Sequence, residues 1–187
     1  MKNNPSLEVL LREALDSPSS YAPGEPALYS FSYPPDSDVY TPQALRRFAN
    51  RTGVLYTEIP RPNELKGRGR ASKNAAVAIA KSLFPYAYVP ERVALYTAIK
   101  TLTELLTSAK TAKSKLLILD RADHFSTPGL NKPLYADFYS FLISLKQQSQ
   151  TKTTILVAGY SPTLNSLIEH ESNLMVRVRR LDVASIT

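Results

Sequence analysis

The sequence predicts an α/β protein in which a mostly parallel sheet of about five strands lies between two layers of helices. Two apolar stretches, KLLILD at 115–120 and TTILVAGY at 153–160, lack the polar alternation of a half-exposed strand, so both of their faces are expected to be covered. Strand-like and helix-like segments also alternate along the chain, as they do where helices connect parallel strands. These two observations favour a three-layer α/β fold.

The composition is that of a soluble domain with a basic surface. The 187 residues are enough for a hydrophobic core, and the lack of cysteine excludes a disulfide scaffold or a cysteine-ligated zinc site. His124 and His170 do not have the spacing of metal ligands. The 23 Lys and Arg against 16 Asp and Glu give a formal net charge of +7, which favours a polyanionic partner.

The first residues, MKNNPSLEVLLREAL, do not have the pattern of a secretory signal. No apolar run approaches the roughly 18 to 20 residues that a bilayer-spanning helix needs. We therefore expect an intracellular, soluble protein of the cytoplasm or nucleus, with no membrane partner.

The chain is expected to divide into an N-terminal helix and linker at 1–26 and an α/β domain at 27–187. Thr41 and Pro42 form a good N-cap and first helical position, and Gly53 a good helix end. The polar, glycine-containing segment 61–74 is typical of an exposed loop. Strands are predicted at 27–33, 54–60, 115–120, 153–160 and 173–183. Helices are predicted at 6–15, 44–50, 75–84, 91–106 and 137–148.

The motif LLILD, Leu116 to Asp120, places four aliphatic residues before an aspartate at the end of the third predicted strand. This motif and the order of the elements from residue 27 to 183 resemble the P-loop NTPase superfamily, in its RecA-like and AAA+ branch. The resemblance implies that LLILD is the Walker B strand and that Asp120 orients water on Mg²⁺ beside nucleotide phosphates. It also places Ser161 where the family has a polar sensor residue. The alternative is that Asp120 caps a turn or pairs with Arg121.

The Walker A loop of that family does not stand where the resemblance requires it. The loop needs glycines whose neighbouring N–H groups surround the phosphates, a lysine, and a hydroxyl for magnesium. The segment after the first strand is YPPDSDVYTPQAL, which has neither Gly nor Lys. The segment GRGRASKN at 67–74 is a partial match to the motif with Lys73 in place, and the favoured alternative is a solvated basic loop. The resemblance is therefore to a degenerate member of the superfamily.

The catalytic glutamate is also displaced. AAA+ members have Glu directly after the Walker B Asp, where this chain has Arg121, whereas RecA-like members have it after the second strand, where Glu58 stands. Glu58 and Asp120 are thus the weak candidates for catalysis, Asp120 for a metal and Lys73 for a nucleotide. An exposed glutamate at a strand end is the alternative for Glu58.

Basic residues form two groups that favour nucleic acid or an acidic partner, with solvated surface charge as the alternative. The candidate nucleic-acid-binding residues are Lys66, Arg68, Arg70 and Lys73 on the predicted loop, and Arg177, Arg179 and Arg180 on the last predicted strand. On a strand, Arg177 and Arg179 would share one face. Tyr86 and Tyr88, beside the loop, either stack on bases or anchor an interface or the core.

These features predict a non-catalytic, pseudo-ATPase subunit that uses no cofactor. Its expected partners are other protein subunits, themselves ATPase-like, and DNA or RNA, as in recombinase-paralogue or Elongator-like assemblies. One alternative is an active ATPase, such as a small AAA+ transposition helper, that uses ATP, Mg²⁺, Lys73, Asp120 and Glu58. Another is a structural component of a ribonucleoprotein assembly.

Overall fold

The computed structural model describes residues 7–16, 27–34, 36–61, 70–108, 116–127, 132–148 and 154–181. The helices are α1 (Leu7–Asp16), α2 (Pro42–Thr52), α3 (Ala71–Leu83), α4 (Leu95–Ser108), α5 (Tyr135–Gln148), α6 (Thr163–Glu169) and α7 (Ser172–Arg177). The main strands are β1 (Leu28–Tyr33), β2 (Leu55–Glu58), β3 (Leu116–Asp120), β6 (Thr154–Tyr160) and β7 (Val178–Arg180). A 3-10 helix, η2 (Ala122–His124), and a short antiparallel pair, β4 (Ser126–Thr127) and β5 (Lys132–Pro133), follow β3. Within these ranges, no helix is both long and apolar enough to cross a bilayer.

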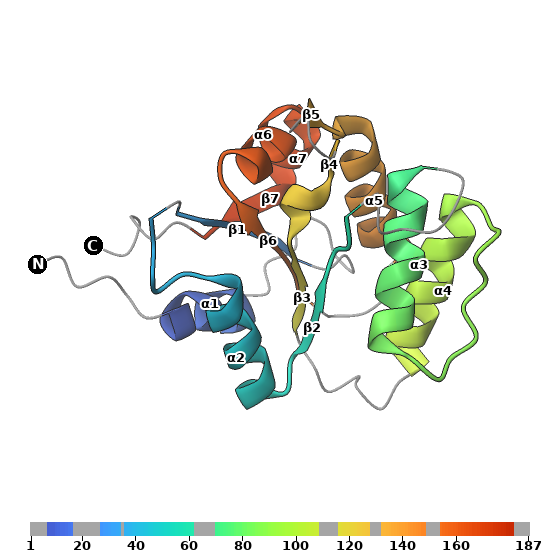
Figure 1. Ribbon diagram of the computed structural model, residues 1–187, viewed down its shortest axis with the longest axis horizontal. Coiled ribbons are helices and arrows are strands. Elements are labelled where there is room, and N and C mark those ends of the chain that lie inside the picture. Colours follow the sequence, from blue (N-terminus) through green and yellow to red (C-terminus); the bar gives the residue numbers. More distant parts are fainter. Residues whose placement is uncertain are drawn as a thin grey trace, which may run out of the picture.

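The five main strands form one sheet in the order β2-β3-β6-β1-β7, and every neighbouring pair is parallel (Figure 1). The predicted α/β fold with five parallel strands is confirmed. The first strand in the chain lies inside the sheet, because Leu28 of β1 pairs with Ile155 of β6 on one side and with Val178 of β7 on the other. All five strands therefore end at the same edge of the sheet.

Helices cover both faces of the sheet, which makes the fold three-layered (Figure 1). On β3 the residues Leu116 and Ile118 face the layer of α1 and α2, while Leu117 and Leu119 face the layer of α3, α4, α5, α6 and α7. All four aliphatic side chains are buried. The absence of polar alternation in LLILD thus has its expected cause, a strand that is covered on both faces.

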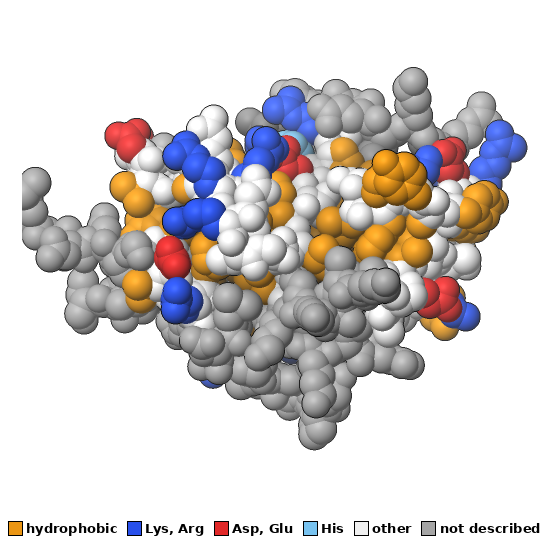
Figure 2. All heavy atoms as spheres, turned by 90° about the horizontal axis from the view of Figure 1, so that it is seen from below, with side chains coloured by type: hydrophobic (Ala, Val, Ile, Leu, Met, Phe, Trp, Pro, Cys, Tyr) orange, Lys and Arg blue, Asp and Glu red, His pale blue; other side chains and the backbone are white. Residues whose placement is uncertain are grey.

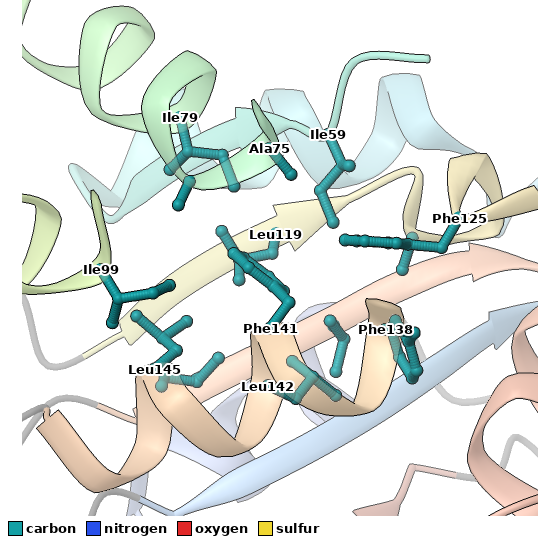
Figure 3. Close-up of a cluster of buried hydrophobic side chains, with 14 of the residues drawn as sticks. Ile59, Ala75, Ile79, Ile99, Leu119, Phe125, Phe138, Phe141, Leu142 and Leu145 are labelled. Atoms are coloured by element: carbon teal, nitrogen blue, oxygen red, sulfur yellow. The ribbon is translucent and has the colours of Figure 1, made fainter. Parts of the chain in front are cut away.

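The larger of the two cores is centred on three phenylalanines. Phe138 and Phe141 of α5 pack against Phe125 at ring-centroid distances of 5.4 and 5.5 Å. Figure 3 shows these rings in one cluster with the sheet residue Leu119 and with side chains of α3 and α4, including Ile79 and Ile99. Buried aromatic side chains of this size supply much of the hydrophobic free energy of a core.

The limits of α2 follow from local chemistry, as the sequence predicts. The Thr41 hydroxyl accepts a hydrogen bond from the Ala44 N–H at 3.2 Å, and Pro42 occupies the first helical position. Gly53 ends the helix with a left-handed φ of 69°, and its N–H donates to the Ala49 carbonyl. Both ends of α2 are therefore fixed by residues within and beside it.

The prediction of one strand over 173–183 is wrong in its first half. Residues from Ser172 to Arg177 form α7, and only Val178–Arg180 form β7. Period-two alternation would bury Val176 together with Leu174, yet Val176 is 67% exposed. A helical turn instead brings Leu174 and Val178, four residues apart, to the buried side.

Helix α3 begins at Ala71, four residues before its predicted start at 75. Lys73 therefore lies in the first turn of a helix and not in the predicted loop 61–74. The sequence did not predict α6 or η2 at all. Both are short, with 7 and 3 residues, so they carry little periodic signal.

We predict that Gly159→Ala destabilises the protein by about 1–3 kcal/mol, because the added methyl overpacks the contact between β6 and η2. A Cβ at Gly159 would lie 2.9 Å from the Asp123 backbone nitrogen and 3.3 Å from that of Ala122. Gly53→Ala is the control, since its Cβ would meet open space and cost only about 1 kcal/mol for the positive φ. Urea unfolding measures both, and a smaller loss for Gly159→Ala than for Gly53→Ala would contradict the prediction.

Candidate functional site

The candidate site lies where the strands end. Glu58, Asp120, Tyr160 and Tyr33 are the last residues of β2, β3, β6 and β1, which are consecutive in the sheet. The chain leaves β1 towards α2 on one face of the sheet and leaves β6 towards α6 on the other. Ligands of parallel α/β sheets bind at such a point, where neighbouring connections diverge.

Asp120 is at the centre of this edge and is inaccessible to solvent. Its exposed fraction is 0%, and its carboxylate accepts three hydrogen bonds from the protein. The Tyr33 hydroxyl donates to Oδ1 and the Tyr56 hydroxyl donates to Oδ2, each at 2.7 Å. The Arg121 N–H also donates to Oδ1 at 2.7 Å. Both carboxylate oxygens are therefore bound to groups of the chain itself.

The pKa values in this group follow from its burial. Desolvation raises the pKa of Asp120, while the hydrogen bonds from Tyr56, Tyr33 and Arg121 oppose that rise and the charge of Glu58 adds to it. Desolvation, and next the carboxylate of Asp120, also raise the pKa values of Tyr33 and Tyr56. The two phenols consequently remain protonated donors at any physiological pH.

Glu58 lies beside Asp120, since the two residues are paired in the register of β2 and β3. Its carboxylate contacts the guanidinium of Arg46 and lies 3.2 Å from the Tyr56 hydroxyl. A phenol has one proton, and the shorter 2.7 Å contact assigns that proton to Asp120. The structure thus brings the two predicted catalytic carboxylates together, but each of them is engaged by a neighbouring side chain.

Arg121 and Tyr160 lie over the Asp120 group. Arg121 has a left-handed backbone with a φ of 60°, and its guanidinium lies 5.3 Å from the centre of the Tyr160 ring. The Tyr160 ring is in turn 5.2 Å from that of Tyr33. Asp123 holds both residues, because it accepts a hydrogen bond from the Tyr160 N–H at 3.0 Å and pairs with Arg121 at 3.6 Å. Arg121, Tyr160, Tyr33 and Asp123 are therefore linked by direct contacts at this edge.

In the turn after β1, several N–H groups donate to oxygen atoms of the chain itself. The Val39 and Tyr40 N–H groups donate to the Ser37 hydroxyl at 3.3 and 2.9 Å. The start of α2 is capped by Thr41, as described above. Tyr40 is buried, and its ring packs against that of Phe31 at 5.9 Å. This turn is where the resemblance to P-loop proteins would require N–H groups that point at phosphates.

Lys73 contacts a different part of the protein. Its Nζ donates to the Glu91 carbonyl at 3.3 Å. At the N-terminus of the same helix, the Ser72 N–H and hydroxyl donate to Asp137 Oδ1 at 3.3 and 3.1 Å. A carboxylate of the protein therefore already occupies the place where the dipole of α3 favours an anion.

The residues of the predicted basic loop are only partly described. Lys66 and Arg68 lie outside the described residues. Arg70 is exposed and directly precedes α3, while Lys73 is half-buried.

The second basic group does not form one strand face. Arg177 is the last residue of α7, so the expectation that Arg177 and Arg179 share a strand face is wrong. Arg179 and Arg180 are exposed on β7, and Arg180 pairs with Glu169 of α6 at 2.9 Å. Of the three arginines in this group, Arg179 and Arg180 thus lie on β7, an edge strand of the sheet.

The donor atoms at Asp120 do not fit the magnesium ion that the family resemblance implies. Mg²⁺ is bound by accessible carboxylate oxygens together with several waters. Both oxygens of Asp120 instead accept hydrogen bonds from tyrosine hydroxyls. Among the described residues, no group of three or more His, Asp or Glu is placed to hold a metal. His124 is bound to the Ile59 carbonyl through Nδ1 at 2.6 Å, and desolvation lowers its pKa.

The decisive residues that the sequence interpretation missed are Tyr33 and Tyr56. A weak signal for them was present, because Tyr56 stands two positions before Glu58 and so points to the same side of β2. A second weak signal was Tyr33, whose bulky phenol ends β1, where a phosphate loop would begin. Neither signal identifies the carboxylate that the phenols bind.

We predict that Tyr33→Phe lowers the free energy of unfolding by about 1–3 kcal/mol, because it leaves a buried carboxylate oxygen with one donor fewer. Urea unfolding followed by circular dichroism measures the loss. Tyr86→Phe is the matched control, since Tyr86 is fully exposed and the same change there should stay within about 0.5 kcal/mol. Equal effects of the two substitutions would rule out a structural role for the Tyr33 hydroxyl.

We also predict a specific dependence of stability on pH. The folded pKa of Asp120 is raised above its unfolded value of about 3.9, so the folded state binds more protons between these two values. The contribution of Asp120 is fully present below about pH 3.9 and is lost as pH rises through the folded pKa. The unfolding free energy of the wild type minus that of Asp120→Asn should therefore fall from acidic to neutral pH. A difference that rises over this range would show that the folded pKa is depressed.

Comparison with known proteins adds no relative to this description. No protein-family model matches the chain, and no curated protein matches it significantly. The strand order and the hydrogen bonds of Asp120 are consequently the observations from which a function is proposed.

Proposed function

We propose that this chain is a non-catalytic subunit with a P-loop NTPase-like core whose nucleotide site is closed by its own side chains. It acts through protein contacts and a basic surface in a nucleic-acid-associated complex. The observation that carries the proposal is the state of Asp120, the residue that the resemblance assigns to the Walker B position. Its carboxylate is buried, and each of its two oxygens accepts a hydrogen bond from a tyrosine hydroxyl.

The topology supports the resemblance on which the proposal builds. In a P-loop protein the end of the first strand and the end of the Walker B strand must face the same nucleotide. Here the last residue of β1, Tyr33, donates directly to the last residue of β3, Asp120, although 87 positions separate them in the chain. The ends of β1 and β3, which would face the nucleotide, thus lie together, but they are hydrogen-bonded to each other.

The electrostatics at this edge oppose a triphosphate. Phosphate binding needs N–H donors and cations, whereas three N–H groups before and at the start of α2, those of Val39, Tyr40 and Ala44, donate to Ser37 and Thr41. Two carboxylates, Glu58 and Asp120, stand side by side at the edge. Like charges brought close together in a poorly hydrated site repel strongly.

The contacts of Lys73 favour this reading over that of an active ATPase. An ATPase of the alternative kind needs the lysine, Asp120 and Glu58 around one nucleotide. Lys73 is bound to the Glu91 carbonyl instead, and the start of its helix is bound to Asp137. Asp120 accepts the Tyr56 hydroxyl proton in a hydrogen bond, and Glu58 contacts the guanidinium of Arg46.

The association with nucleic acid rests on charge. The chain carries a formal net charge of +7, and Arg70, Arg179 and Arg180 are exposed. A surface of this kind attracts the phosphate backbone without regard to sequence. The protein partners are proposed to be ATPase-like subunits, by analogy of fold.

The test is the binding of mant-ATP, with and without Mg²⁺, followed by fluorescence. The expected result is no binding at micromolar concentration, because the donors and carboxylates that a nucleotide needs are occupied. Micromolar affinity that is lost in both Lys73→Ala and Asp120→Asn, but kept in the control Lys100→Ala, would overturn the proposal. Lys100 is a suitable control because it is exposed on α4 and paired only within that helix, with Glu104.

A further inference from the structure

The connection between α3 and α4 presents two tyrosines on a fixed backbone. Its start is closed by a turn in which the Ala87 N–H donates to the Phe84 carbonyl at 3.0 Å. Val89 is buried in the main core and anchors the segment one residue after Tyr88. Tyr86 and Tyr88 alternate along the chain with Ala87 and Val89, so their rings point away from the protein.

These rings are exposed to an extent that is unusual for aromatic side chains. Tyr86 is 101% and Tyr88 is 88% exposed, and Tyr96, in the first turn of α4, is 65% exposed. Figure 2 shows large hydrophobic side chains at the right-hand end of the surface, the end at which Figure 1 places α3 and α4, with charged side chains beside them. Apolar ring faces that stay in water gain free energy when a flat partner covers them.

A cluster of cations adjoins the tyrosines in the chain. Lys81 of α3 contacts the Glu91 carboxylate, and Lys73 of α3 contacts the Glu91 carbonyl at 3.3 Å. Arg92 is exposed directly after Glu91. Lys81 lowers the pKa of Glu91, through its hydrogen bond and then its charge, and Arg92 and Lys73 act in the same direction. Lys73, Lys81 and Arg92 therefore lie around Glu91, three residues after Tyr88.

We propose that Tyr86, Tyr88 and the cation cluster of Lys73, Lys81 and Arg92 form a binding site for single-stranded nucleic acid. Two bases stack on the exposed rings, and the cations contact the phosphates between and beside them. Proteins that bind single strands without sequence preference combine these two elements, aromatic faces and a positive groove. A duplex is a poorer ligand, because its bases are already stacked on one another.

The charge distinguishes this occupant from a protein partner. The centre of a protein interface is depleted in lysine, whereas here Lys73 and Lys81 both contact Glu91, three residues after Tyr88. Phosphates also match the charge of the cluster, with one negative charge for each nucleotide. A protein that covers the two rings would have to desolvate three cations for one carboxylate.

This inference rests on the proposed function only in that the chain is taken to work beside a nucleic acid. The two can be told apart. Binding of mant-ATP that depends on Lys73 and Asp120 would overturn the closed nucleotide site and leave this surface unaffected. Oligonucleotide binding that the tyrosine substitutions leave unchanged would overturn this surface and leave the proposed function unaffected, whereas no oligonucleotide binding at all would overturn this surface and the nucleic-acid part of the proposed function.

The experiment is fluorescence anisotropy of labelled dT20, rU20 and a 20-base-pair duplex with the full chain, over a series of salt concentrations. We expect both single strands to bind at least about tenfold more tightly than the duplex, with an affinity that falls as salt rises. Tyr86→Ala/Tyr88→Ala should weaken binding by about tenfold for each ring lost. Arg92→Ala should reduce the salt slope by about 0.7, the value for one phosphate contact on a single strand.

Two further variants separate stacking from apolar contact. Tyr86→Phe/Tyr88→Phe keeps the ring faces and should bind as the wild type does. Tyr86→Leu/Tyr88→Leu keeps apolar bulk but should bind as weakly as the double alanine variant. Val176→Ala, an exposed apolar residue on α7, is the control and should bind normally. Full affinity in the double alanine or double leucine variant, or no binding by the wild type, would overturn the proposal.

Discussion

The burial of one carboxylate constrains much of this structure. Asp120 ends a strand that is covered on both faces, so its charge lies where water cannot solvate it. Three donors compensate for the lost water, and they come from three places, Tyr33 on β1, Tyr56 on β2 and the N–H of Arg121. Because the strands must be in register for these donors to reach one carboxylate, the hydrogen bonds also fix how the strand ends of the sheet align.

The same place in other parallel sheets is used for ligands, and the physical reason is the divergence of the connecting segments. In this chain the tyrosines turn that place into part of the interior. The Arg121 guanidinium and the Tyr160 ring extend the closure outward, and Asp123 holds both of them. The loss of one member of such a network leaves a buried polar group without its partner, which lowers the stability of the fold.

The proposed activities of the protein consequently lie at its surface. The closed edge and the tyrosine and cation surface between α3 and α4 have opposite character. At the closed edge the buried Tyr33 and the half-buried Tyr56 act as hydrogen-bond donors, whereas in the α3–α4 connection Tyr86 and Tyr88 are exposed and offer their ring faces. Tyrosine suits both roles, because it joins a large apolar ring to one polar group. Its eleven copies in the chain thus do not have one common function.

The sequence by itself determined the features that depend on neighbouring residues. The apolar runs at 116–120 and 154–160 identified buried strands, Thr41, Pro42 and Gly53 fixed the ends of α2, and the alternation of elements gave the fold class. It failed where a short segment lacked periodicity, as in α6, or where alternation imitated a strand, as at Leu174 to Val178. Only the tertiary structure decided the partners of Asp120, because Tyr33 and Tyr56 are 87 and 64 positions away in the chain. Caps and periodic patterns act over a few residues, whereas the contacts that close this site arise only when distant strands pair.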